Sequence, residues 1–416
     1  MKNDMKRILI LITTSFPYGK LEPFIESELN YYKNFDKVLC LAIHRNGELR
    51  KIDYPSNFSY KSINDYKFSR DIKYIFKYLF KKSFWSELHT LLITNRLSLT
   101  NLRYLISVTI QAEHYYKAIK KEIKEIEKSS NKKNKYYFYS YWMVEHALCC
   151  IKLKRRLIHS INFTRAHGYD LYEYRYKGNY IPYRKYILKE SNLVIPISND
   201  GFEYLKDRYG EFNNIEISRL GTIDYGISNK IESDYDLTVV SCAWCSKVKR
   251  IDRIITSLSS IKNHKIKWYH IGDGDLFNRL KDLAEEKLPE NIHYEFLGQL
   301  PNQKILEFYK NNRIDLFINT SASEGIPVSI MEVQSFGIPV IATDVGGVKE
   351  IITHNRNGYL INKEFKDEEL TSLIESFARM SKKEIDTLRE VSRTMWENKY
   401  SAKENYTKLF NKIIKM

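Results

Sequence analysis

Two glutamates in the C-terminal half stand at a spacing suited to an elongated, phosphorylated ligand. Glu324 precedes a predicted helix and Glu332 lies about two turns into it, with Gly325 and Pro327 between them. Gly325 permits an unusual backbone angle, and Pro327 suits a first helical turn, whose free N–H groups bind anions. Carboxylates accept hydrogen bonds from pairs of sugar hydroxyls. The alternative is that Glu324 only caps the helix and Glu332 is a solvated surface residue.

The elements around these glutamates predict a parallel sheet. Residues 236–352 alternate five apolar strand patterns with five helical patterns, which implies a sheet with helices on both faces. The first half opens in the same way, with an apolar run at 8–12, a helix at 23–34 and another strand at 37–44. Ligands of such sheets bind beyond the carboxyl ends of the strands.

The segment SASEGIPVSIMEVQSFGIPVIATDVGGVKEII resembles the donor-binding signature of family 4 retaining glycosyltransferases, which have the GT-B fold. The resemblance covers nearly all of residues 190–416. It implies that Glu324 lies against the donor sugar and that Glu332 binds the ribose of the nucleotide. The backbone that it assigns to the sugar and diphosphate is that of Gly325, Ile326, Pro327, Val328 and Ser329.

The resemblance also implies two cations for the diphosphate. Lys249 matches the family's lysine, but Trp244 stands where the family has an arginine. Arg250 or Arg219 could replace that arginine. The nearby pair Cys242 and Cys245 has the CxxC spacing of redox sites, but it lies in this loop and has no second Cys or His pair for zinc.

In the first half, His167 follows a predicted strand and resembles the family's acceptor-side histidine, which reaches the reacting sugar. An imidazole changes charge near neutral pH and could donate to a sugar hydroxyl. The alternative is a histidine bonded to backbone at a strand end. Gly19 follows the first strand, where the family's loop approaches the diphosphate, although the family's paired glycines are missing.

The expected fold class is therefore α/β of the GT-B type: two Rossmann-like, doubly wound domains that face each other across a cleft. Residues 1–218 would form the acceptor-binding domain, with a helical elaboration at about 60–135, and residues 219–393 the nucleotide-sugar domain. A terminal helix at 394–416 would pack back on the first domain. In the elaboration, residues 71–92 set apolar and aromatic side chains against lysines, which is typical of a helix that covers its own domain or lies in a membrane interface.

The charge of the chain is unevenly divided. Residues 1–220 contain 39 Lys and Arg against 23 Asp and Glu, a net charge of +16, whereas the remaining residues contain 28 of each sign. The excess of basic residues in the first half indicates one of two things. Either the charge only keeps the protein soluble, or this half binds an anionic partner, such as a membrane surface or a charged lipid-linked acceptor. No nucleic-acid-binding signature is present.

The sequence also indicates where in the cell the protein is expected. It shows no secretory signal, no apolar run long enough to cross a membrane, and five cysteines without framework spacing. We therefore expect a cytoplasmic protein, with the inner face of the cell membrane as a second location.

The predicted activity is transfer of a sugar from a nucleotide-diphosphate donor, with UDP as the favoured nucleotide, to a glycan or lipid-linked acceptor in surface polysaccharide synthesis. The resemblance implies retained anomeric configuration, no cofactor, no obligatory metal and no covalent nucleophile. Two alternatives remain open: another GT-B enzyme, such as a sugar-nucleotide 2-epimerase, and a noncatalytic nucleotide-sugar or glycan-binding subunit.

Overall fold

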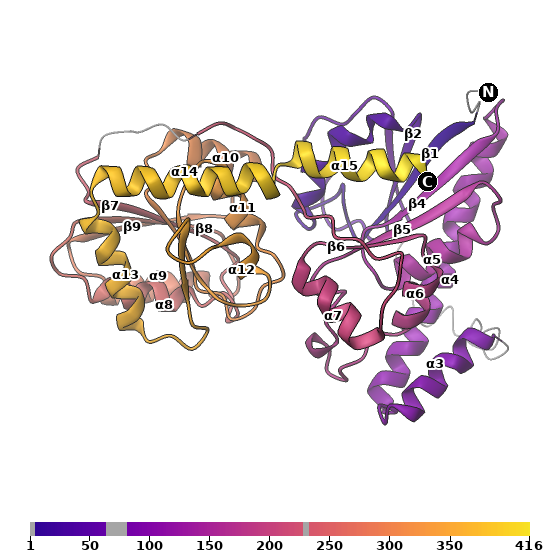
Figure 1. Ribbon diagram of the computed structural model, residues 1–416, viewed down its shortest axis with the longest axis horizontal. Helices are drawn as coiled ribbons and strands as arrows, with labels where there is room; N and C mark the ends of the chain where they lie inside the picture. Colours follow the sequence, from indigo (N-terminus) through magenta and orange to yellow (C-terminus); the bar gives the residue numbers. More distant parts are fainter. Residues whose placement is uncertain (1–4, 64–80, 228–232) are drawn as a thin grey trace. The chain divides into compact units, whose positions relative to one another are not determined.

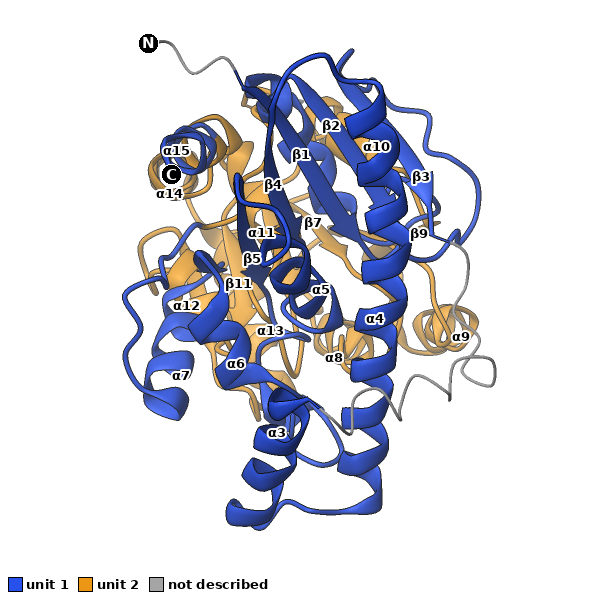
Figure 2. Ribbon diagram, turned by 90° about the vertical axis from the view of Figure 1, so that its right-hand side faces the viewer, with its two compact units in different colours: residues 1–218, 407–416 blue, residues 219–406 orange. Residues whose placement is uncertain are grey.

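The computed structural model describes residues 5–63, 81–227 and 233–416. It divides into two compact units, which Figure 2 distinguishes by colour. Unit 1 consists of residues 1–218 and 407–416, and unit 2 of residues 219–406. Each unit contains its own six-stranded sheet with helices around it (Figure 1). The fold is therefore α/β with two doubly wound sheets, as the alternation of apolar and helical patterns predicts.

The sheet of unit 1 is parallel throughout, in the order β3-β2-β1-β4-β5-β6. Its central strands are continuous apolar runs because helices cover both of their faces. The order reverses between β1 and β4, which is where such sheets leave a crevice for ligands at their carboxyl ends. The strands are β1 Lys6–Thr13, β2 Lys37–Ala42, β3 Phe58–Ser62, β4 Asn134–Ser140, β5 Ser160–Ala166 and β6 Leu193–Pro196.

The helical segments of unit 1 include the predicted one at Pro23–Asn34, which forms a 3-10 helix, η1. The helical elaboration appears as α3 and the long α4, whereas residues 71–80 of the predicted amphipathic segment lie outside the described residues. The segments other than η1, including α3 and α4, lie between the strands. They are α3 Lys82–Ile93, α4 Leu99–Lys128, α5 Glu145–Lys154, η2 Glu173–Arg175, α6 Arg184–Glu190 and α7 Asn199–Tyr209.

The sheet of unit 2 has the order β12-β11-β10-β7-β8-β9, again parallel, with its reversal between β7 and β10. The strands are β7 Leu237–Cys242, β8 Ile266–Ile271, β9 Ile292–Gly298, β10 Leu316–Asn319, β11 Val340–Thr343 and β12 Gly358–Ile361. The helices are α8 Ile251–Ser259, α9 Phe277–Lys287, α10 Asn302–Asn311, α11 Val328–Ser335, α12 Val348–Ile351, α13 Asp367–Arg379 and α14 Lys382–Lys399.

The C-terminal segment belongs to both units. Helix α14 packs on α11 of unit 2, and the boundary between the units falls after residue 406, not at the expected residue 393. Helix α15 (Ala402–Lys415) then carries the buried Phe410 into unit 1, where its ring lies 5.3 Å from that of Tyr32. Trp396 stays in unit 2, since its indole N–H donates to Thr222 Oγ1 at 2.7 Å.

Candidate functional site

Glu324 lies in the loop between β10 and α11, where it forms an ion pair with Lys249. The distance from Lys249 Nζ to Glu324 Oε1 is 2.5 Å, and Asn319 Nδ2 donates to the same oxygen at 3.4 Å. The Glu324 side chain is 10% exposed. The residue that caps α11 is Pro327, and it makes no side-chain capping bond. Glu324 is therefore held by Lys249 and does not act as the helix cap.

Arg250 ties the loop after β7 to the loop after β10. Its backbone is left-handed, with φ at 50°, and its guanidinium donates to the carbonyl oxygens of Thr320, Ser321 and Lys363. In return, Thr320 Oγ1 donates to the carbonyls of Lys249 and Arg250 at 3.1 and 2.9 Å. These bonds fix the position of Lys249 beside Glu324. They also engage the Arg250 guanidinium with backbone carbonyl oxygens.

Arg219, the other residue that could replace the missing arginine, also has a carboxylate partner. Its Nη2 atom lies 3.2 Å from Glu350 Oε2. Trp244, which occupies the family's arginine position, is 49% exposed. A Cβ at Gly274 would come within 2.8 Å of Trp244 Nε1, so the two loops touch at this point.

Glu332 is buried, with 7% of its surface exposed, so the interpretation of Glu332 as a solvated surface residue is wrong. Its Oε1 atom accepts a hydrogen bond from Asn302 Nδ2, at the start of α10, at 2.6 Å. Burial, and then the charge of Glu332, raise the pKa of the Cys242 thiol at the end of β7 to about 12. Residues from three strand ends of unit 2 thus gather around the start of α11.

The backbone between the two glutamates packs against a pair of glycines in the loop between β11 and α12. Gly347 N donates to Gly325 O at 2.7 Å. A Cβ at Gly346, whose φ is 54°, would lie 2.2 Å from Glu324 O, and one at Gly347 would lie 2.5 Å from Ile326 Cγ1. Ile326 is itself buried, so only its backbone can face a ligand. The first turn of α11 leaves the amides of Val328 and Ser329 without intrahelical partners.

The CxxC pair lacks the features of a redox site. Both thiols are free, and burial raises the pKa of Cys245 to about 11. A reactive cysteine needs a lowered pKa. Cys245 Sγ lies 3.2 Å from His270 Nε2, and burial lowers the pKa of that histidine to about 4. Within the described residues, no group of three or more His, Cys, Asp or Glu side chains is arranged to hold a metal ion.

His167 lies at the end of β5 in unit 1, inside a group of aromatic rings. The ring centroids of Trp142, Tyr141 and Phe24 lie 4.7, 5.1 and 5.5 Å from that of the imidazole. His167 is 7% exposed, and its ring nitrogens make no hydrogen bond in the structure, although Nδ1 lies 3.7 Å from Asp170 Oδ2. Asp170 also accepts from the backbone N–H of His167 at 2.7 Å. The imidazole is therefore held by the packing of the rings and by the Asp170 carboxylate, not by backbone bonds to its ring.

The Glu22 carboxylate accepts hydrogen bonds from the backbone amides that follow β1. It accepts from the N–H groups of Thr14, Ser15 and Phe16 at 2.9, 2.8 and 2.8 Å, and from Trp142 Nε1 at 2.6 Å. Gly19 N donates to Glu48 O, and a Cβ at Gly19 would lie 1.8 Å from Asn46 O. Gly19 thus allows a close approach between two loops, and the amides beside it are engaged by Glu22.

We expect Glu22→Ala to lower the Tm of the protein by about 5 °C or more. The change leaves three amides and an indole N–H without their acceptor, and each buried group without a partner costs about 1 to 3 kcal/mol before water relieves it. In units of this size, about 1 kcal/mol shifts Tm by about 2 to 4 °C. Differential scanning calorimetry measures the shift, with the exposed Glu48→Ala as control. Equal Tm values for the two variants would show that the Glu22 contacts do not stabilise unit 1.

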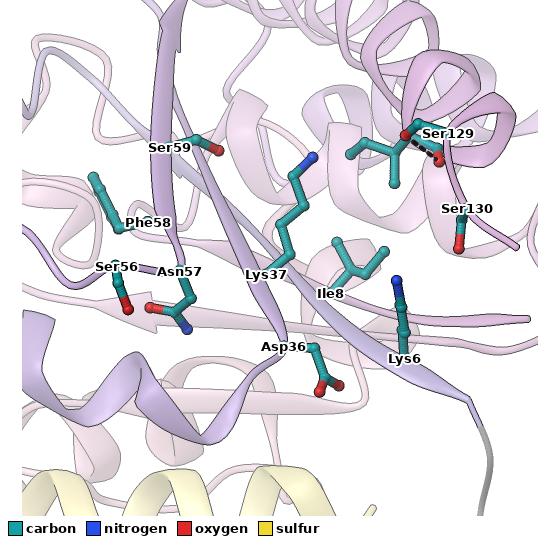
Figure 3. Close-up of a pocket in the computed structure, with 11 residues that line it drawn as sticks. Lys6, Ile8, Asp36, Lys37, Ser56, Asn57, Phe58, Ser59, Ser129 and Ser130 are labelled. Atoms are coloured by element: carbon teal, nitrogen blue, oxygen red, sulfur yellow. Dashed lines mark hydrogen bonds between the residues drawn. The ribbon is translucent and has the colours of Figure 1, made fainter. Parts of the chain in front are cut away.

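The cavity drawn in Figure 3 is not this site. It has a volume of about 420 Å³ and is lined by residues such as Lys6, Lys37, Phe58 and Ser129. Lys6, Lys37 and Phe58 begin β1, β2 and β3, and Ser129 follows α4. The cavity therefore lies at the amino ends of the strands, whereas ligands of parallel sheets bind at the carboxyl ends.

Several of the residues described in the two units were not predicted from the sequence. Asn302, Asn319 and Thr320 support the two glutamates and Lys249 through side-chain bonds, and Glu22 holds Trp142. Asn319 and Thr320 end the predicted strand before Glu324, so their position beyond a strand end was an available signal. For the contact of Asn302 with Glu332 and that of Glu22 with Trp142 the sequence offers none, because the partners are 30 and 120 residues apart.

In sequence, the chain is similar to known glycosyltransferases. Residues 227–393 match the family model of glycosyl transferases group 1. The putative colanic acid biosynthesis glycosyltransferase WcaL of Salmonella typhimurium is 24% identical over 236 residues, which are 55% of this chain and 57% of that protein. The match thus spans little more than half the length of this relative.

Two solved structures resemble the whole chain. The lipopolysaccharide outer core galactosyltransferase WaaB, in its apo form, has a TM-score of 0.65 and 16% identity, covering 98% of this chain and 99% of that one. HepE of Anabaena in complex with UDP has a TM-score of 0.64 and 13% identity, covering 99% and 100%. At such identities the likeness concerns the fold alone, which is the GT-B fold.

Proposed function

We propose that the protein is a retaining glycosyltransferase that uses a nucleotide-diphosphate sugar, with UDP as the nucleotide, since residues 227–393 match the family model of glycosyl transferases group 1. The observation that carries the proposal is the arrangement around the start of α11. There a lysine–glutamate pair, a second buried glutamate and the amides of a first helical turn gather at the carboxyl edge of unit 2.

Each group has a role that follows from its chemistry. The N–H groups of Gly325, Ile326, Val328 and Ser329 and the Lys249 ammonium would bind the diphosphate, since both present positive charge to anionic oxygens. Glu324 would accept hydrogen bonds from the donor sugar, and Glu332 from the ribose. In the structure the Lys249 ammonium forms an ion pair with Glu324. When the donor binds, the same ammonium would also face a phosphate oxygen.

In the transfer itself, the bond from the sugar C1 to the phosphate oxygen breaks and a bond from C1 to the acceptor oxygen forms on the same face. The acceptor proton passes to the departing phosphate oxygen, so the reaction needs no covalent nucleophile. Lys249 and the helix amides stabilise the negative charge that grows on the leaving diphosphate. His167 of unit 1 would hydrogen-bond to a hydroxyl of the reacting sugar.

The acceptor that we propose is a glycan or a lipid-linked glycan of a cell-surface polysaccharide. Support comes from the relative WcaL, which is described as a colanic acid biosynthesis glycosyltransferase, and from WaaB, described as a lipopolysaccharide outer core galactosyltransferase. The basic excess of residues 1–220 supports the anionic inner face of the cell membrane as the place where this acceptor is met.

A thermal-shift screen of nucleotides and nucleotide sugars tests the donor assignment, because a ligand of the folded state raises Tm by mass action. We expect UDP and UDP-sugars to raise Tm more than AMP or inorganic phosphate do. With the stabilising donor identified, incubation with lipid-linked acceptors should release UDP. An epimerised sugar formed from donor alone would instead indicate an epimerase. Nucleotide-sugar binding with no turnover for any acceptor would favour the noncatalytic subunit, to which the missing arginine at Trp244 points.

A further inference from the structure

Helix α3 and the turn that follows it expose a group of apolar side chains. We name this group the α3–α4 tip. Its members are each about half exposed or more: Trp85 53%, Leu92 54%, Ile93 68%, Leu97 49% and Leu99 75%. Single exposed apolar residues are common, but a cluster on one projecting element is typical of an interaction site.

The tip is not needed to complete the core of unit 1. The opposite face of α3 is buried through Phe84 and Leu91, which belong to a core cluster that also contains Leu105 and Tyr180. Glu87 on the same inner face accepts a hydrogen bond from Tyr180 Oη at 2.8 Å. Helix α3 is thus anchored from within, while its outer face presents apolar side chains to the surroundings.

Arg96 forms an ion pair with the buried Glu173, and the exposed charged side chains of the segment that forms the tip are basic. The segment from Lys81 to Arg103 contains four basic residues and one acidic residue, Glu87. Because Glu87 is 8% exposed and faces inward, the outer surface of this segment carries no carboxylate, whereas Lys82 and Arg103 are exposed. Exposed aliphatic side chains, a tryptophan and basic residues form the surface that an anionic bilayer attracts.

The tip lies on the side of unit 1 where a substrate would enter. Helix α4 has 30 residues, which span about 45 Å, whereas the eight residues of β1 span about 26 Å. The end of α4 lies beside the amino ends of the strands, at the cavity of Figure 3, so its beginning extends beyond their carboxyl ends. Figures 1 and 2 both show α3 and the start of α4 beyond the sheet.

We propose that the α3–α4 tip inserts into the interface of an anionic lipid bilayer and thereby holds the carboxyl edge of unit 1 near a membrane-bound acceptor. The docking itself does not depend on the proposed function; only the benefit to the acceptor does. Within the described residues, no helix is long and apolar enough to cross a bilayer, so the tip would lie in the interface.

Vesicle flotation tests the docking. We expect the full chain to float with vesicles of phosphatidylglycerol and phosphatidylcholine, less so at high salt, and only weakly with phosphatidylcholine alone. The variant Ile93→Ser/Leu99→Ser should bind the anionic vesicles at least about tenfold more weakly, because two apolar anchors are lost. Ile158→Ser is the matched control, since Ile158 is 94% exposed on unit 1 but lies outside the tip. It should bind as the unchanged protein does.

A second measurement locates the contact. Brominated lipids quench tryptophan fluorescence inside a bilayer, and we expect vesicles containing them to quench the protein, with the Trp85→Phe variant losing most of that effect. Equal flotation of the double variant and the unchanged protein, or equal binding to neutral and anionic vesicles at all salt concentrations, would overturn the proposal. So would a dimer in size-exclusion chromatography that the double variant dissociates, since the tip would then bind a second copy.

These experiments need no nucleotide, sugar or acceptor. Loss of flotation with intact UDP binding would therefore reject only the docking surface. Normal flotation of a protein that binds no nucleotide would reject only the proposed function.

Discussion

Replacing Lys249 with alanine is expected to lower kcat/KM for sugar transfer by at least about 30-fold, which corresponds to about 2 kcal/mol of transition-state stabilisation. The Lys249 ammonium is the cation that the structure places next to Glu324, at 2.5 Å, within the loop that precedes α8. Its charge would oppose the negative charge of the departing diphosphate. Steady-state kinetics with the donor found by thermal shift measures the loss.

A double substitution separates this catalytic role from a structural one. If the pair only stabilised its loops, each single variant would leave a partly buried charge without its partner, and Lys249→Ala/Glu324→Ala would recover what the single variants lose. We expect the double variant to be at least as inactive as either single variant, with a Tm close to that of the unchanged protein. Recovery of transfer in the double variant would contradict the assignment of both residues to the donor.

Gly346→Ala is expected to weaken donor binding and to lower kcat/KM by about 100-fold. The new Cβ would lie 2.2 Å from Glu324 O, so the loop that carries Glu324 and Gly325 must move. A misplacement of about 1 Å in a substrate-positioning group can cost about 10²-fold in rate. Isothermal titration with UDP and steady-state kinetics measure the two losses.

Gly210→Ala controls for backbone strain. Gly210 also has a positive φ, 88°, but a Cβ there meets nothing within 4 Å, and the residue ends α7 in unit 1. Both variants should lose some stability, since an alanine at positive φ is strained. Only Gly346→Ala should lose donor binding. Equal donor binding by the two variants would show that the contact between Gly346 and Glu324 has no part in the site.

Local patterns revealed most of the fold. Continuous apolar runs such as Ile8–Ile12 predict buried parallel strands because both faces of the sheet are covered, and the structure confirms them. The short strands β3 and β12 were missed. The residues of β3 are mostly half-exposed at a sheet edge, and β12 has only four residues and begins at Gly358, so neither carries a strong periodic signal.

The sequence by itself determined how the two glutamates are spaced about the start of α11. These residues are neighbours in the chain, so the local backbone conformation fixes the spacing. Only the tertiary structure decided what surrounds them. Lys249 and Glu324 meet across 75 residues, and Asn302 and Glu332 across 30. Glu22 and Trp142 meet across 120 residues. Such pairs form because parallel strands bring their carboxyl ends to one edge of a sheet, and no periodicity along the chain records which side chains meet there.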